Sequence, residues 1–141
     1  MAWRDAGEAE RIMIGRRYLG LAALSVLCIA SRPAWARSQP FSGEAFEAAQ
    51  AGDLPILIDV SASWCPTCRT QEPILARFLA EPRFAQMVAF EVDYDRQKPV
   101  VRQFGVRMQI TLIVFRGRDE IGRSVGDTNP ASIESLLDMA Q

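Results

Sequence analysis

A short apolar run at residues 55–60 is followed closely by two cysteines three positions apart, and this order constrains the fold more than any other feature. The run, Pro-Ile-Leu-Ile-Asp-Val, is rich in β-branched residues and has the length of a buried strand. After Cys68 the apolar residues recur at helical spacing. Cys65 is therefore predicted at the start of a helix, where unpaired backbone N–H groups and the helix dipole favour a thiolate. The stretch predicts a redox-active dithiol.

The composition of the 141-residue chain removes several classes of chemistry. It contains no histidine, which excludes Ser-His-Asp and Cys-His catalysis and every metal site that needs imidazole. Neither glycine-rich phosphate motif, G-x-x-x-x-G-K-[ST] nor G-x-G-x-x-G, occurs in it. The formal net charge of −1 gives no indication of nucleic-acid binding. The chemistry therefore has to come from cysteine, carboxylate and backbone groups.

Residues 1–36 have the order of an N-terminal extension followed by an export signal peptide. Arg16 and Arg17 precede an apolar stretch at residues 18–30, and an A-x-A cleavage pattern ends at Ala36. The apolar stretch is shorter than the roughly 20 residues that a spanning helix needs. We therefore expect cleavage after Ala36 and a periplasmic protein, with an uncleaved membrane anchor as the alternative.

The expected cleavage site determines the bounds of the mature domain and the number of cysteines in it. Removal of the signal takes away Cys28 and leaves a single domain at residues 37–141, whose only cysteines are Cys65 and Cys68. Met13 begins a more ordinary signal than Met1 does, because residues 1–12 carry acidic side chains ahead of the basic pair. The start codon and the export route, general secretion or twin-arginine, stay open.

The remaining chain alternates apolar runs and helical patterns in one series. Strands are expected at residues 39–41, 56–60, 87–93, 111–115 and 120–125, and helices at residues 42–51, 65–80, 99–104 and from 129 onward. A β-α-β unit followed by an antiparallel hairpin and a terminal helix predicts an α/β fold. Its single mixed sheet is flanked by helices on both faces.

The residues around the dithiol resemble the thioredoxin family over nearly all of the domain. The segment at residues 62–68, Ala-Ser-Trp-Cys-Pro-Thr-Cys, is similar to the family's A-x-W-C-x-x-C signature. Pro73 matches the family's proline in the active-site helix, Asp59 its buried aspartate, and Gly126 a glycine after the last strand. The resemblance implies a thioredoxin-like fold and a cofactor-free thiol–disulfide oxidoreductase. It further implies a monomeric protein that acts on protein thiols and disulfides. As a periplasmic reductant, such a protein would receive electrons from a membrane-bound donor.

Three positions depart from the family pattern. The family has a cis-proline where this chain has Ile110, in the loop that binds the substrate chain, here Gln109, Ile110 and Thr111. Because a cis bond before a non-proline residue costs roughly 3–4 kcal/mol, we predict a trans Gln109–Ile110 peptide and a differently shaped loop. Ser61 replaces a tryptophan, and Glu91 replaces the lysine that pairs with the buried aspartate. Two carboxylates placed together are expected to raise at least one pKa.

The expected reaction is thiol–disulfide exchange. Cys65 is predicted to be the nucleophile, because it is nearer the helix start and is expected to be the more exposed of the two cysteines. Cys68, one turn further along, resolves the mixed disulfide. Asp59 either accepts the proton of Cys68 or serves only as a structural carboxylate.

The neighbours of the cysteines have expected roles of their own. Trp64 is predicted to pack over the dithiol, with substrate contact as a secondary role. Pro66 and Thr67 tune the reduction potential, because they set which backbone N–H groups face the Cys65 sulfur and proline removes one of them.

Two alternatives to redox catalysis remain. Two chains could each offer Cys65 and Cys68 to zinc or an iron–sulfur cluster, completing four thiolates, whereas one chain has too few ligands. In the other alternative, a permanent Cys65–Cys68 disulfide staples a loop in a non-catalytic binding domain. A loop this short adds little stability through chain entropy.

Overall fold

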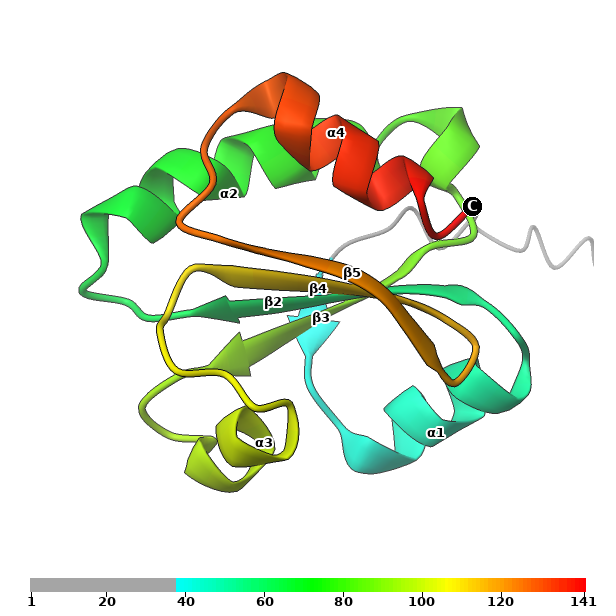
Figure 1. Ribbon diagram of the computed structural model, residues 1–141, viewed down its shortest axis with the longest axis horizontal. Coiled ribbons are helices and arrows are strands. Elements are labelled where there is room, and N and C mark those ends of the chain that lie inside the picture. Colours follow the sequence, from blue (N-terminus) through cyan, green and yellow to red (C-terminus); the bar gives the residue numbers. More distant parts are fainter. Residues whose placement is uncertain (1–37) are drawn as a thin grey trace, which may run out of the picture. The chain divides into compact units, whose positions relative to one another are not determined.

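The computed structural model describes residues 38–141, which form a five-stranded sheet of order β1-β3-β2-β4-β5 (Figure 1). The strands are β1 (Gln39–Pro40), β2 (Pro55–Ser61), β3 (Val88–Asp93), β4 (Thr111–Arg116) and β5 (Asp119–Val125). The helices are α1 (Gly43–Ala51), α2 (Pro66–Leu79), the 3-10 turn η1 (Pro82–Phe84), α3 (Lys98–Gln103) and α4 (Pro130–Asp138). Every strand and helix expected from the sequence is present, with ends shifted by a few residues at most.

Strand β2 lies at the centre of the sheet, parallel to β3 and antiparallel to β4. Its residues Ile56, Leu57, Ile58 and Val60 are all buried, because helices cover both faces of the sheet. This explains why the sequence shows a continuous apolar run there instead of an alternating pattern. Asp59 interrupts the run, and its register partner on β3 is Glu91.

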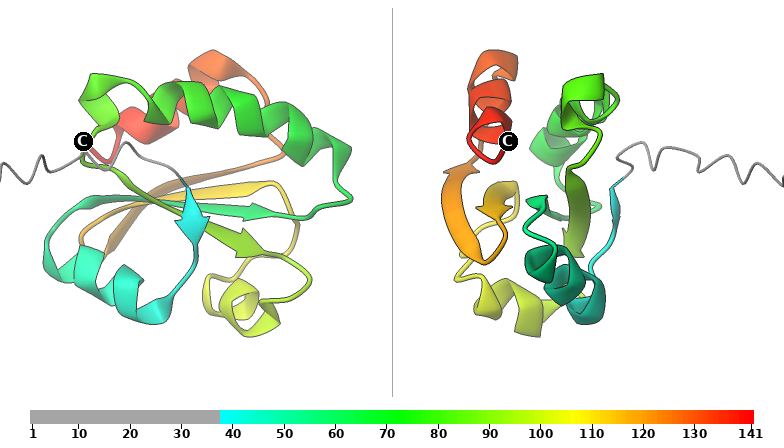
Figure 2. Two further views of the ribbon diagram at one scale, coloured as in Figure 1. Left: turned by 180° about the vertical axis from the view of Figure 1, so that it is seen from behind. Right: turned by 90° about the vertical axis from the view of Figure 1, so that its right-hand side faces the viewer.

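The helices form one layer on each side of the sheet. Helices α2 and α4 cover one face and α1 and α3 cover the other (Figures 1 and 2). Each layer closes over its own apolar cluster. The first includes Leu57, Phe78, Leu112 and Leu137, and the second includes Phe46, Phe90, Phe104 and Phe115. None of the helices in residues 38–141 combines the length and apolar character needed to cross a membrane.

Local signals explain where the helices begin. Ser42 caps α1 by accepting a hydrogen bond from the Ala45 N–H, and Asn129 caps α4 in the same manner. Helix α2 begins at Pro66, a residue that suits the first helical position because its missing N–H would have no partner there. Helix starts were predicted at residues 42, 65 and 129, and each is confirmed to within one residue. The start of α2 at Pro66 places the cysteine pair between the end of β2 and the beginning of this helix.

Candidate active site

Cys65 and Cys68 form a disulfide at the N-terminus of α2, with their Cα atoms 5.3 Å apart. Cys65 is the N-cap residue, and its Sγ accepts a hydrogen bond of 3.1 Å from the Cys68 N–H. In the reduced protein the same N–H and the helix dipole would stabilise a Cys65 thiolate. The strand–loop–helix prediction for the dithiol is therefore confirmed, and it explains why Cys65 is suited to be the attacking sulfur.

Both cysteines are buried, which corrects the expectation that Cys65 is the more exposed. Cys65 is 3% exposed and Cys68 is 7% exposed. Ala62 and Ile110 are buried against the pair, and Tyr94 packs on the same small cluster. Exposure depends on these neighbours from distant parts of the chain, and position along the helix does not determine it. In this oxidised form, Cys68 borders a cavity that Cys65 does not reach.

Ile110 faces the disulfide from the loop before β4. Residues 38–141 contain no cis peptide bond, so the Gln109–Ile110 bond is trans, as predicted. Ile110 has φ +62°, a left-handed conformation that is costly for a β-branched side chain. Two backbone hydrogen bonds hold it there: its N–H donates to Val60 O at 2.7 Å, and its carbonyl accepts from the Gly126 N–H at 2.9 Å. A buried, strained isoleucine therefore stands where the family has its proline.

The flanking loop residues differ in accessibility. Thr111 is buried, and its hydroxyl donates to Met108 O at 2.7 Å, which fixes the turn before β4. Gln109 is half-buried and Met108 is exposed. Pro66 and Thr67, which lie between the two cysteines in the sequence, are exposed. The roles predicted for these residues in substrate binding and in tuning the potential stay predictions.

Trp64 is 55% exposed, so the prediction that it mainly packs over the dithiol is wrong. Its indole Nε1 donates a 2.6 Å hydrogen bond to Asp95, in the loop after β3, and Asp95 also pairs with Lys98 at 3.4 Å. An indole held at its polar end can present an exposed face to a partner. The packing role assigned to Trp64 belongs to Tyr94 and Ile110 instead.

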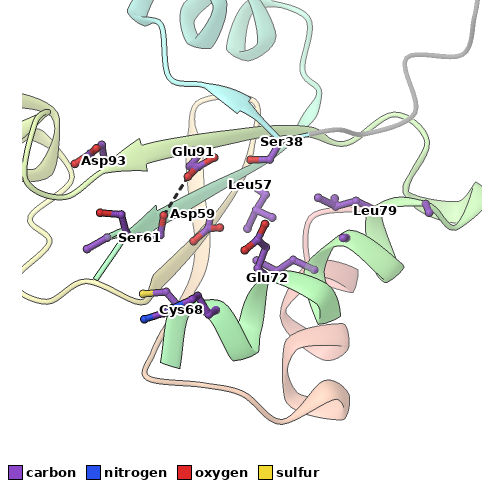
Figure 3. A pocket seen from close by; sticks show the side chains of 15 residues that line it. Ser38, Leu57, Asp59, Ser61, Cys68, Glu72, Leu79, Glu91 and Asp93 are labelled. Carbon is purple, nitrogen blue, oxygen red and sulfur yellow. Dashed lines mark hydrogen bonds between the residues drawn. The ribbon is translucent and has the colours of Figure 1, made fainter. Parts of the chain in front are cut away.

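A cavity of about 660 Å³ lies next to Cys68, between α2 and strands β2 and β3 (Figure 3). Asp59 lies between Glu91 of β3 and Glu72 of α2, and Cys68 borders the same space. Ser61 also lines the cavity, and its hydroxyl donates to Glu91 at 3.3 Å. Since a tryptophan is far larger than serine, the replacement at position 61 leaves room for this opening.

The environment of Asp59 raises its pKa to about 7. Burial is the largest cause, because it disfavours the charged form, and the negative charges of Glu91 and Glu72 add to it. The expected effect of Glu91 is thereby confirmed. Glu72 was missed, although its position four residues after Cys68 places both on one helical face. A carboxyl group that titrates near neutral pH thus lies beside the second cysteine.

Sequence reasoning also missed Gln71, which ties α2 to the loop before α4. Gln71 is buried, and its side-chain amide donates 2.6 Å to Asp127 O in the loop before α4. A polar residue on the inner side of a helix was the only available indication. Within residues 38–141, no three potential metal-binding side chains are grouped so that they could hold an ion.

A disulfide between two cysteines at a helix N-terminus, near a carboxyl group whose pKa is raised to about 7, is the arrangement found in thiol–disulfide oxidoreductases. Comparison with known proteins identifies the family. The Thioredoxin family model matches residues 38–139. Thioredoxin from Alicyclobacillus acidocaldarius subsp. acidocaldarius is 32% identical to this chain over 92 residues, which are 65% of this chain and 87% of that thioredoxin. The chain belongs to the thioredoxin family and is a thiol–disulfide oxidoreductase acting on protein disulfides.

Solved structures agree with this assignment. The structure of Trxlp from Edwardsiella tarda EIB202 superposes with a TM-score of 0.70 at 40% identity, covering 72% of this chain and 98% of that one. Thioredoxin from Trypanosoma brucei brucei has a TM-score of 0.66 at 23% identity, covering 76% of this chain and 93% of its own, and supports the fold alone. The predicted thioredoxin-like fold is confirmed.

Proposed function

We propose that this protein is a periplasmic reductant that opens disulfides in exported proteins. The observation that favours reduction over oxidation is the position of Asp59. With a pKa of about 7, this residue provides a proton acceptor near the resolving cysteine. A reductant must complete its cycle by closing its own disulfide, and this step requires a deprotonated Cys68. A base on the Cys68 side of the pair favours that closure.

The reaction proceeds in two exchanges. The Cys65 thiolate attacks one sulfur of the substrate disulfide, the substrate S–S bond breaks, and the released substrate thiolate takes a proton from water. Cys68 then gives its proton to Asp59 and attacks the Cys65 sulfur of the mixed disulfide. The Cys65–Cys68 bond forms as the second substrate sulfur leaves as a thiolate. Two electrons pass to the substrate, and the protein ends as the oxidised form.

The compartment and the electron donor belong to the same proposal. The signal peptide predicted at residues 1–36 supports export, and these residues lie outside the described part of the chain. Each turnover consumes two electrons, so a periplasmic reductant needs a donor that carries electrons across the membrane. We propose a membrane-bound dithiol donor and a monomeric protein. Fractionation of cells that express the full chain tests export.

Reduction of a model protein disulfide, together with the reduction potential of the Cys65–Cys68 pair, tests this function. The purified protein is expected to reduce insulin in the presence of dithiothreitol, and Cys65→Ser to abolish the activity. Cys68→Ser should accumulate a mixed disulfide, because the resolving sulfur is missing. We expect a potential near that of thioredoxins, about −270 mV. A potential near −120 mV, typical of a strong oxidant, would overturn the proposed direction.

A further inference from the structure

The cavity beside Cys68 is strongly acidic. Four carboxylates line it, from Asp59, Glu72, Glu91 and Asp93, against a single cationic side chain, that of Arg69. The Asp93 carboxylate already has hydrogen-bond donors: it accepts bonds of 2.9 Å from the backbone N–H groups of Arg96 and Asp95, and these bonds hold its pKa below its usual range. The other three carboxylates form no ion pair with any residue in 38–141.

Asp59 supplies a second and independent observation. Its Oδ1 atom is completely buried and has no hydrogen-bond partner among the described residues, although the side chain lines the cavity. Figure 3 shows the carboxylates of Glu91 and Glu72 on either side of it. A buried acceptor without a partner is unfavourable, so Asp59 has unmet hydrogen-bonding capacity at the wall of the cavity. Glu72 and Glu91 are exposed, so the cavity is open to solvent at their side.

The lining indicates what kind of cation fits. The carboxylates are not grouped as metal ligands, and a volume of about 660 Å³ is much larger than a bare ion needs. Part of the wall is aliphatic, formed by Leu57, Leu75 and Leu79. A hydrocarbon stem can lie along such a wall while a planar guanidinium or an ammonium donates to carboxylates.

We propose that this cavity is a binding site for a guanidinium or alkylammonium group carried on an aliphatic stem, which contacts Asp59, Glu72 and Glu91 beside Cys68. The group has two possible sources. Arg37 directly precedes Ser38, which itself lines the cavity, so the chain carries a guanidinium one residue from the site. The other source is an external molecule or the basic side chain of a bound polypeptide.

Occupancy has a consequence for the redox step proposed above. A cation beside Asp59 favours its charged form and so lowers its pKa from about 7. Binding should therefore release protons below neutral pH and strengthen between pH 5.5 and pH 8. The charged and titratable groups that line the cavity with Asp59 are Glu91 and Asp93 from β3 and Cys68, Arg69 and Glu72 from α2. Of these, Glu72 and Glu91 provide the charge that the cation meets.

Calorimetric titration of the purified protein with butylguanidinium tests the site, with butylurea as a neutral ligand of the same shape. We expect saturable binding of butylguanidinium at one per chain, and none of butylurea. The double variant Glu72→Gln/Glu91→Gln should weaken binding about tenfold, because it removes both exposed carboxylates that meet the cation. The control Glu47→Gln/Asp119→Asn removes the same charge from two exposed positions outside the cavity and should bind within twofold of wild type.

An Arg37→Gln variant separates the two sources. If Arg37 fills the cavity, butylguanidinium should bind this variant several-fold more tightly than wild type, and equal affinities would assign the site to an external group. Absence of saturable binding to both proteins would overturn the proposal. So would equal binding of butylurea, or undiminished binding to the double glutamine variant. Insulin reduction without butylguanidinium, measured in parallel, reports separately on the proposed function.

Discussion

Asp59 and Glu91 are direct register partners on the adjacent parallel strands β2 and β3, and both side chains line the cavity beside Cys68. The family resemblance places a lysine at position 91, so an opposite-charge pair is replaced here by two carboxylates. Burial and the negative neighbours both favour the neutral form of Asp59. The protein therefore holds a protonatable carboxyl group at its resolving cysteine near neutral pH.

Replacing Glu91 should lower the pKa of Asp59. Glu91→Gln removes one negative neighbour, and Glu91→Lys adds a positive one, so the pKa should fall in the order wild type, glutamine, lysine. Burial persists in both variants, and the pKa of Asp59 should remain above its ordinary value of 3.8 in Glu91→Gln. NMR titration of the Asp59 carboxyl carbon measures the order. An unchanged pKa in Glu91→Lys would contradict the assigned cause.

Asp59→Asn should stabilise the protein at high pH. The pKa of Asp59 is raised in the folded state, so folding retains a proton that the unfolded chain releases above about pH 4, and stability falls as pH rises toward 7. The variant avoids that loss. It should be more stable than wild type by roughly 4 kcal/mol at pH 8, where the full difference between pKa values of 3.8 and about 7 counts, and by little at pH 4. Urea unfolding at both values measures this, and a pH-independent difference would argue against a raised pKa.

The order of elements could be predicted from the sequence because the relevant signals are local. Continuous β-branched runs indicated β2 and β4, and Ser42 and Asn129 indicated the starts of α1 and α4. Two helical layers then followed from the β-α-β order. The strand at residues 87–93 begins one residue later than expected, at Val88, a difference within the normal fraying of element ends.

The site was only partly predictable, because several of its features depend on contacts between distant segments. The dithiol and Asp59 were found from spacing. The burial of Cys65 depends on Ile110, more than forty positions away, and the cavity depends on how α2 lies over Ser61. No pattern within one segment reports either fact. The exposure of Trp64 likewise depends on Asp95, which holds its indole N–H from another loop.

Ile110→Ala should uncover the cysteines. The isoleucine is 4% exposed and packs on both sulfur-bearing residues, so truncation opens a path to them. We expect alkylation of the reduced protein by iodoacetamide to become several-fold faster, with a loss of about 2 kcal/mol in stability. Val125→Ala is the control, since Val125 is exposed and lies outside the cluster around the cysteines. Equal alkylation rates in wild type and Ile110→Ala would show that this side chain does not shield the pair.

Asp95→Ala should release the indole of Trp64. Loss of the 2.6 Å hydrogen bond leaves the N–H to water, and its exchange with solvent, followed by NMR, should accelerate several-fold. Stability should change by less than about 1 kcal/mol, because both groups are exposed. Lys98→Gln breaks the ion pair with Asp95 but keeps the acceptor, and its exchange rate should stay close to wild type. An indole exchange rate in Asp95→Ala equal to that of wild type would show that Asp95 does not hold the Trp64 side chain.

The proton transfer from Cys68 to Asp59 is the central claim, and the pH dependence of mixed-disulfide resolution tests it most directly. A substrate thiol is attached to Cys65, and the release that forms the Cys65–Cys68 bond is timed by rapid mixing from pH 5 to pH 9. In wild type, the rate should rise through a titration near pH 7, where Asp59 becomes able to accept the proton. Asp59→Asn should lose this step and resolve slowly until the pH reaches the pKa of the Cys68 thiol. The same profile in both proteins would contradict the account.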